Sequence, residues 1–129
     1  MTLFPELAGD HPGLQQVAEL LSKHRFRFTS EMELQAGIAL VLETHGVLFQ
    51  REYVISNADR LDFFLLGGLA IEVKIDGTLM QALRQVSRYA NHPEILGILL
   101  IGTPRWLPEV PPALNSKPVQ GLRLLGSML

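Results

Sequence analysis

Two short apolar runs, residues 61–66 and 69–75, lie on either side of a Gly-Gly pair. Runs of this length and composition, separated by glycines, predict the two strands of a β-hairpin. Three charged residues interrupt them: Asp62 in the first run, and Glu72 and Lys74 in the second. Because an unpaired charge is costly to bury, charges in such runs are usually paired or hold a metal ion.

Alternation along a strand places Glu72 and Lys74 on the same face, with the apolar residues between them pointing into a core. Two carboxylates and a lysine on one sheet surface suit a magnesium site, since Mg²⁺ takes a few carboxylates and keeps several waters. A two-residue turn would oppose Asp62 to Val73 and put Asp62 and Glu72 on opposite faces. A shared site therefore requires a three-residue connection, a bulge or a sharp bend, and a positive φ at one glycine.

A helix is predicted after the hairpin, from the capping residue Thr78 to about Ala90, where a proline follows. Gln85 and Tyr89 are four residues apart and share one face of this helix. Because the helix directly follows the strand with Glu72, we expect that face to border the site. An ordinary solvent-facing polar stripe is the alternative.

An earlier helix is predicted to begin at the cap Ser30 and to end at Gly46. Glu33 stands three residues after the serine and completes a capping box. Glu31 is not needed for that box and projects from the start of the buried stripe. It is either a site residue or an acidic residue favoured by the helix dipole.

The ordered set of residues resembles the signature of the PD-(D/E)XK nuclease superfamily. Asp62, Glu72 and Lys74 match its D-(x)n-E-x-K pattern across a hairpin. Gln85 and Tyr89 match the Q-x-x-x-Y helix of the RecB-like branch. No proline precedes the aspartate here, a departure that many members share.

The resemblance covers about residues 30–102 of a chain of 129 residues, a length that fits one domain, residues 1–129. The expected fold is α/β, with a small mixed sheet flanked by helices. Its implied core is restriction-endonuclease-like, in the order helix–strand–strand–strand–helix–strand, after an extra N-terminal helix over residues 13–23. The last core strand is the continuous apolar run 95–101, buried on both faces. Joined through the helix, it should pair in parallel with the strand before it.

The resemblance implies a metal-dependent nuclease that cuts DNA, and endonuclease activity is among the activities it implies. It also assigns a role to each matched residue. The metal polarises the phosphate and lowers the pKa of a bound water. Lys74 orients that water and balances charge in the transition state. Gln85 and Tyr89 position DNA or support the lysine. The implied ligands of Mg²⁺ or Mn²⁺ are Glu31, Asp62, Glu72 and the main-chain carbonyl of Val73.

Two other readings stay open. A Holliday junction resolvase is close in size and shares the acidic triad and the lysine, but it ranks second because the Q-x-x-x-Y helix is not part of its pattern. A nuclease-like fold without catalysis, serving as a DNA-binding or assembly module, ranks third because all the expected acidic residues and the lysine are present.

The net charge of −2 argues against a protein that coats DNA non-specifically, but it allows a local positive surface. The basic stretch 23–27 is either a phosphate-facing patch or a solvated helix end. The chain lacks cysteine, which excludes disulfides and thiolate metal sites.

The first residues lack a signal-peptide pattern and no apolar run reaches membrane-spanning length, so we expect a cytoplasmic protein without a membrane partner. A domain of this size has little surface with which to grip both strands of a duplex. The proline-rich segment around Trp106 leaves room for a partner surface. We therefore expect a homodimer.

Overall fold

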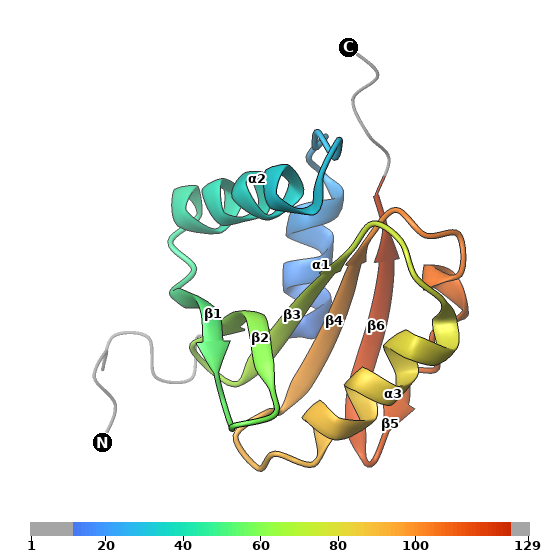
Figure 1. The fold of residues 1–129 in the computed structure, drawn as a ribbon. Helices are drawn as coiled ribbons and strands as arrows, with labels where there is room; N and C mark the ends of the chain where they lie inside the picture. Colours follow the sequence, from blue (N-terminus) through green and yellow to red (C-terminus); the bar gives the residue numbers. More distant parts are fainter. Residues whose placement is uncertain (1–11, 125–129) are drawn as a thin grey trace.

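A six-stranded mixed sheet forms the centre of residues 12–124, the part of the chain that the computed structural model describes. Three α-helices and a short 3₁₀ helix accompany the sheet (Figure 1). In chain order the elements are α1 (Leu14–Ser22), α2 (Glu31–Thr44), β1 (Phe49–Val54), β2 (Arg60–Leu65), β3 (Leu69–Lys74), α3 (Leu79–Ala90), β4 (Gly97–Gly102), η2 (Leu107–Glu109), β5 (Ala113–Leu114) and β6 (Lys117–Arg123).

The strands lie in the order β1-β2-β3-β4-β6-β5. β1 pairs with β2 and β2 with β3 in antiparallel fashion, β3, β4 and β6 run parallel to one another, and β5 is antiparallel to β6. Lys74 at the end of β3 stands opposite Gly102 of β4, which stands opposite Arg123 of β6. The carboxyl ends of the three parallel strands therefore meet at one edge of the sheet.

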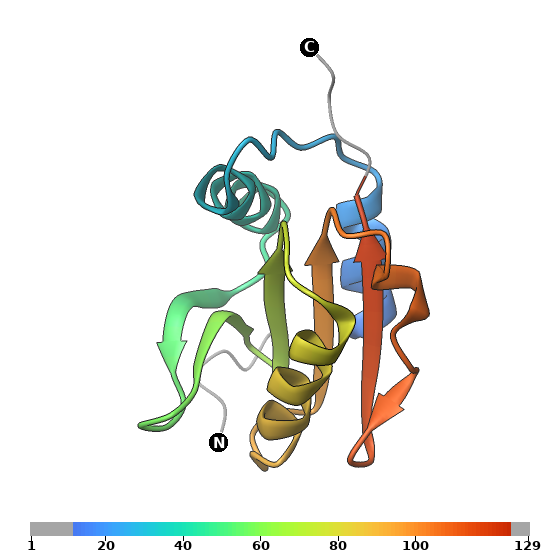
Figure 2. The same ribbon diagram turned by 45° about the vertical axis from the view of Figure 1, so that its right-hand side comes forward.

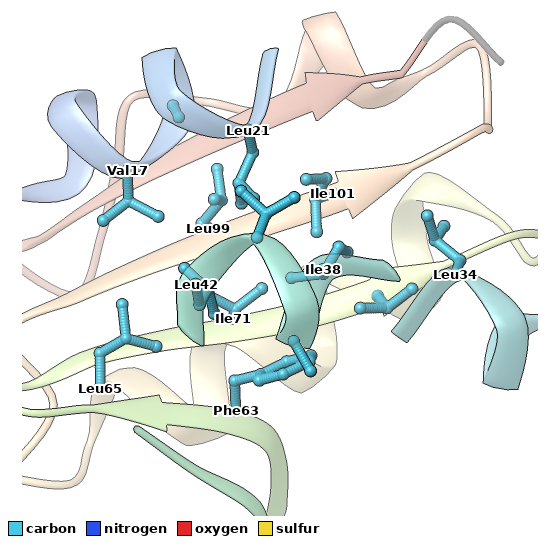
Figure 3. Close-up of a cluster of buried hydrophobic side chains, with 14 of the residues drawn as sticks. Val17, Leu21, Leu34, Ile38, Leu42, Phe63, Leu65, Ile71, Leu99 and Ile101 are labelled. Atoms are coloured by element: carbon cyan, nitrogen blue, oxygen red, sulfur yellow. The ribbon is translucent and has the colours of Figure 1, made fainter. Parts of the chain in front are cut away.

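Helices cover both faces of the sheet. On one face α1 and α2 pack their apolar residues against β2, β3 and β4, as the close-up of this cluster shows (Figure 3). On the other face α3 and η2 cover a second apolar cluster (Figure 2). All six residues of β4 are buried because both of its faces are covered.

The predicted order of helices and strands is confirmed, and β3 and β4 pair in parallel through α3 as expected. Residues 119–125 also predict a short strand; the structure has β6 (Lys117–Arg123) there and adds β5, which was not expected. Residue 125 lies outside the described residues, as do residues 1–11, on which the expectation of a cytoplasmic protein partly rests. No helix within residues 12–124 has the length and apolarity needed to cross a membrane.

The helix starts follow the predicted caps, with one correction. Thr78 and Gln81 form a complete capping box at α3. At α2 the Ser30 hydroxyl accepts the Glu33 amide, 3.0 Å away, as expected. The Glu33 carboxylate, however, does not reach back to the Ser30 amide. It accepts hydrogen bonds from the backbone N–H and the hydroxyl of Thr29, at 3.0 and 2.9 Å, because the residue before the cap presents two donors there.

Candidate functional site

The hairpin between β2 and β3 has the three-residue connection that a shared site requires. Leu65 pairs with Leu69, which leaves Leu66, Gly67 and Gly68 as the loop. Both glycines have positive φ, 104° and 97°, a region that glycine enters at little cost. Continuing this register down the strands brings Asp62 opposite Glu72, on the same side of the sheet.

At Asp62 and Glu72 the backbone–backbone hydrogen bonds between β2 and β3 are replaced by hydrogen bonds from the backbone to the two carboxylates. The Asp62 N–H donates to Oε1 of Glu72, 3.1 Å away, and the Val73 N–H donates to Oδ2 of Asp62 at 2.8 Å. Each carboxylate is thus held by the backbone of the opposite strand. The two acids converge because their side chains replace backbone partners at this position.

At the same level β2 changes the face of the sheet to which its apolar side chains point. Phe63 packs in the apolar cluster under α1 and α2, whereas Leu61, two residues earlier, packs in the cluster under α3. On β1, Glu52 lies between the residues paired with these two and has a φ of 53°. A left-handed residue reverses the face on which the following side chains lie, so β1 and β2 change faces together.

Arg51 and Glu52 are neighbours in the chain, but they bind different partners. Glu52 pairs with Arg60, Nε to Oε2 3.1 Å. The Arg51 guanidinium instead donates to Gln35 of α2 at 3.2 Å and lies over the Phe63 ring.

The Q-x-x-x-Y pair on α3 contacts the acid pair through Tyr89, which is 2% exposed. The Tyr89 hydroxyl lies 3.2 Å from Oε1 of Glu72 and 3.0 Å from the carbonyl of Arg60, and Gln85 Nε2 donates to it at 2.9 Å. One hydroxyl hydrogen cannot serve both acceptors at once. Of the two α3 side chains, Tyr89 contacts Glu72 directly, and within the described residues neither is hydrogen-bonded to Lys74.

Burial and mutual repulsion disfavour the state in which both Asp62 and Glu72 are ionised. Glu72 is 4% exposed, and burial, followed by the neighbouring charge of Asp62, raises its pKa to about 9. Burial also raises the pKa of Asp62, although the Val73 amide opposes the shift. Burial and Glu72 together raise the pKa of the Tyr89 hydroxyl. A cation between the carboxylates would relieve this repulsion.

Lys74 and Glu31 meet at the carboxyl edge of the sheet. Lys74 ends β3 two residues after Glu72, and Glu31 is the first residue of α2. Burial, followed by the charge of Asp62, raises the pKa of Glu31, while Lys74 opposes the shift. Both side chains border a cavity of about 150 Å³, which we call the Lys74 hollow. Its other polar or aromatic lining residues are Asp76, Thr78, Gln81 and Trp106.

The donor set fits a divalent cation held by two carboxylates. The hydrogen bonds from the backbone and from Tyr89 involve Oδ2 of Asp62 and Oε1 of Glu72, which leaves Oδ1 and Oε2 without a backbone or tyrosine partner among the described residues. Between Pro12 and Leu124, no three acidic, histidine or cysteine side chains are grouped as a ready metal cage, and the role of Glu31 as a ligand stays a prediction. Mg²⁺ is commonly bound by one or two carboxylates with water and substrate phosphates. The Val73 N–H donates to Asp62. The role of the Val73 carbonyl as a metal ligand, which the resemblance implies, stays a prediction.

A buried acid for which the sequence predicted no role at the site supports this centre. Asp59 is 6% exposed and binds two side chains of the α3 end, Arg88 Nε at 3.2 Å and His92 Nε2 at 2.9 Å. These two contacts hold the start of β2 in place, and with it the Arg60 carbonyl that Tyr89 contacts. The spacing of Arg88 and His92, four residues apart, was the only sequence signal.

No family model, no curated protein and no solved structure matches the chain. The nuclease resemblance therefore rests on the residues themselves and on the geometry they adopt.

Proposed function

We propose that the protein is a metal-dependent nuclease of the PD-(D/E)XK type that hydrolyses DNA phosphodiester bonds. The observation that carries the proposal is the convergence of Asp62 and Glu72, held by each other's strand, with Lys74 on the same strand as Glu72. The proposal includes the finer fold assignment: α2, the three strands β1 to β3, α3 and β4 form a restriction-endonuclease-like core.

Each residue of the site has a separate task. A bound Mg²⁺ or Mn²⁺ would supply Lewis-acid polarisation of the phosphate and a water of lowered pKa. Asp62 and Glu72 would hold it, and Glu31 adds negative charge at the opening. The Lys74 ammonium orients the attacking water and balances charge that develops on the phosphate oxygens. Tyr89, placed by Gln85, keeps Glu72 in position.

A positively charged groove near the site supports DNA as the substrate. Lys23 and Arg25, after α1, and Arg123, at the end of β6, line a cavity of about 420 Å³, the basic groove. Arg123 lies at the carboxyl edge in the row that begins with Lys74. No described acidic side chain forms a salt bridge with these three cations. Of the two readings of the basic stretch, this arrangement favours the phosphate-facing one.

The test is cleavage of linear, circular, single-stranded and branched DNA, with Mg²⁺, with Mn²⁺ and with a chelator. Wild-type protein should cut in either metal and not with the chelator, and Asp62→Asn prepared in parallel should not cut. Cutting confined to four-way junctions would favour a resolvase. Binding without cutting in either metal would contradict the nuclease proposal and favour the non-catalytic module. The expected homodimer stays a prediction, which light scattering with DNA at assay concentration checks.

A further inference from the structure

Trp106, the one tryptophan of the chain, lies beside the candidate site rather than in the apolar interior. It follows β4, and its indole Nε1 donates to the carbonyl of Gly77, 3.0 Å away, in the turn after β3. The ring packs only partly against the cluster under α3. It borders the Lys74 hollow, so an aromatic ring and the proposed catalytic lysine line one cavity.

The hollow combines apolar walls with hydrogen-bond donors that bind no other described residue. Ile75 and Ala82 line it together with the indole. In the capping box the Thr78 hydroxyl accepts the Gln81 amide, and Gln81 Oε1 accepts the Thr78 amide. The Thr78 hydroxyl hydrogen and the Gln81 Nε2 group donate to no described residue. An aromatic wall with donors at its rim suits a flat heteroaromatic ring.

We infer that the Lys74 hollow takes an unpaired nucleobase, stacked on Trp106, from the nucleotide next to the phosphate that reacts. The inference rests on the proposed function and adds a substrate class to it. A base within a duplex has both faces covered by its neighbours, so only a single-stranded, frayed or extruded nucleotide offers a free face. The nuclease would therefore prefer DNA with unpaired nucleotides at the cleavage position.

Direct evidence comes from the intrinsic fluorescence of Trp106, since no other tryptophan contributes to the signal. Asp62→Asn protein, which should not cut, is titrated with a single-stranded oligonucleotide, a blunt duplex and an abasic oligonucleotide of equal length. The single strand should change the fluorescence saturably. The duplex and the abasic strand should change it far less, because neither presents a free base.

Two substitutions separate stacking from a structural role of the indole. Trp106→Phe and Trp106→Leu both lose the hydrogen bond to Gly77, but only phenylalanine keeps an aromatic face. In the Asp62→Asn background, anisotropy of a labelled single strand should show binding about tenfold weaker for Trp106→Leu than for Trp106→Phe. Melting temperatures of the two variants provide the control for folding. Leu96→Ala, at an exposed apolar residue outside the hollow, should bind like the parent.

The outcomes distinguish this inference from the proposed function. If the wild type cuts DNA while saturation with single strand leaves the Trp106 fluorescence unchanged, the base site is overturned and the nuclease stands. Equal affinity of the leucine and phenylalanine variants overturns it as well. If the protein neither binds nor cuts any DNA, both proposals fail.

Discussion

The two halves of the sheet are held together in different ways. In the parallel half β3, β4 and β6 keep a regular ladder, and β4 is buried along its whole length. In the hairpin half the ladder between β2 and β3 covers three residue pairs and then gives way to the carboxylates of Asp62 and Glu72. In a regular ladder the backbone N–H and C=O groups bind one another, so none is left for a polar side chain. The interruption places two acids together, and the parallel half provides the rigid frame.

The largest expected effect is on catalysis in the hairpin half. Asp62→Asn, Glu72→Gln and Lys74→Ala should each lower the cleavage rate by on the order of 10³-fold or more, because the three groups act as a unit. Cleavage is measured with linear DNA in Mg²⁺, and circular dichroism checks that each variant is folded. Wild-type-like cleavage by any of the three, free of contaminating nuclease, removes the site assignment.

The matching change in the parallel half should affect stability instead. Leu99, fully buried in β4, pairs with Ile71 and packs in the cluster under α1 and α2, on the face of the sheet opposite Tyr89. Leu99→Ala should lower the free energy of unfolding by about 2–5 kcal/mol, through lost burial and the cavity left behind. Urea unfolding measures the loss, and cleavage well below the melting temperature should persist. A loss of stability below about 1 kcal/mol would show that β4 is not the rigid frame.

The pH dependence of stability follows from the raised pKa of Glu72. A group whose pKa is higher in the folded state stabilises fully below its unfolded value, and the contribution disappears as pH rises toward the folded value. The window therefore runs from about pH 4.5 to about 9. Metal-free protein should lose on the order of 3 kcal/mol of stability between pH 5 and 8, measured by urea unfolding in chelator.

A variant provides the control for this pH effect. Glu72→Gln should flatten the dependence, because glutamine does not titrate, and Asp62→Asn should raise stability by removing the repulsion. The lowered pKa of Asp59, which its His92 and Arg88 bonds maintain against burial, acts only below the usual aspartate range and leaves this window unaffected. An unchanged slope in Glu72→Gln would mean that another group causes it.

A smaller difference separates the two glutamates of α2. Glu31 faces Lys74 and Asp62, whereas Glu33 is engaged with Thr29. Glu31→Gln should lower metal affinity or cleavage rate by roughly tenfold, measured from rates across a Mg²⁺ titration. Glu33→Gln should leave activity near the wild type, because glutamine still reaches the Thr29 donors. The reverse ranking would reassign the site acid.

The smallest effect concerns the basic groove, whose lining includes neither acid of the pair. Lys23→Ala and Arg25→Ala should each weaken DNA binding a few-fold and lower the slope of log affinity against log salt by about 1 per lost phosphate contact. Arg84→Ala, an exposed cation of α3, provides the control. Equal slopes in all proteins would make the groove an ordinary solvated surface.

The sequence by itself determined the local structure and the faces of its elements. Strand alternation predicted that Asp62 and Glu72 share a face only with a three-residue loop, a bulge or a sharp bend. The observed loop has three residues, and its two glycines adopt positive φ at little cost. Spacing of four on a helix put Gln85 and Tyr89 on one face. These features depend on residues near in the chain, whose relative geometry is limited by a few dihedral angles.

Only the tertiary structure decided which distant groups meet. The packing of α3 on the sheet puts the Tyr89 hydroxyl at Glu72, and the fold brings Asp59 to Arg88 and His92. Trp106 reaches the turn after β3 because β4 ends beside it. Such contacts depend on how whole elements pack, which the periodicity of one segment does not contain. The raised pKa of Glu72 has the same origin, since burial by other elements creates it.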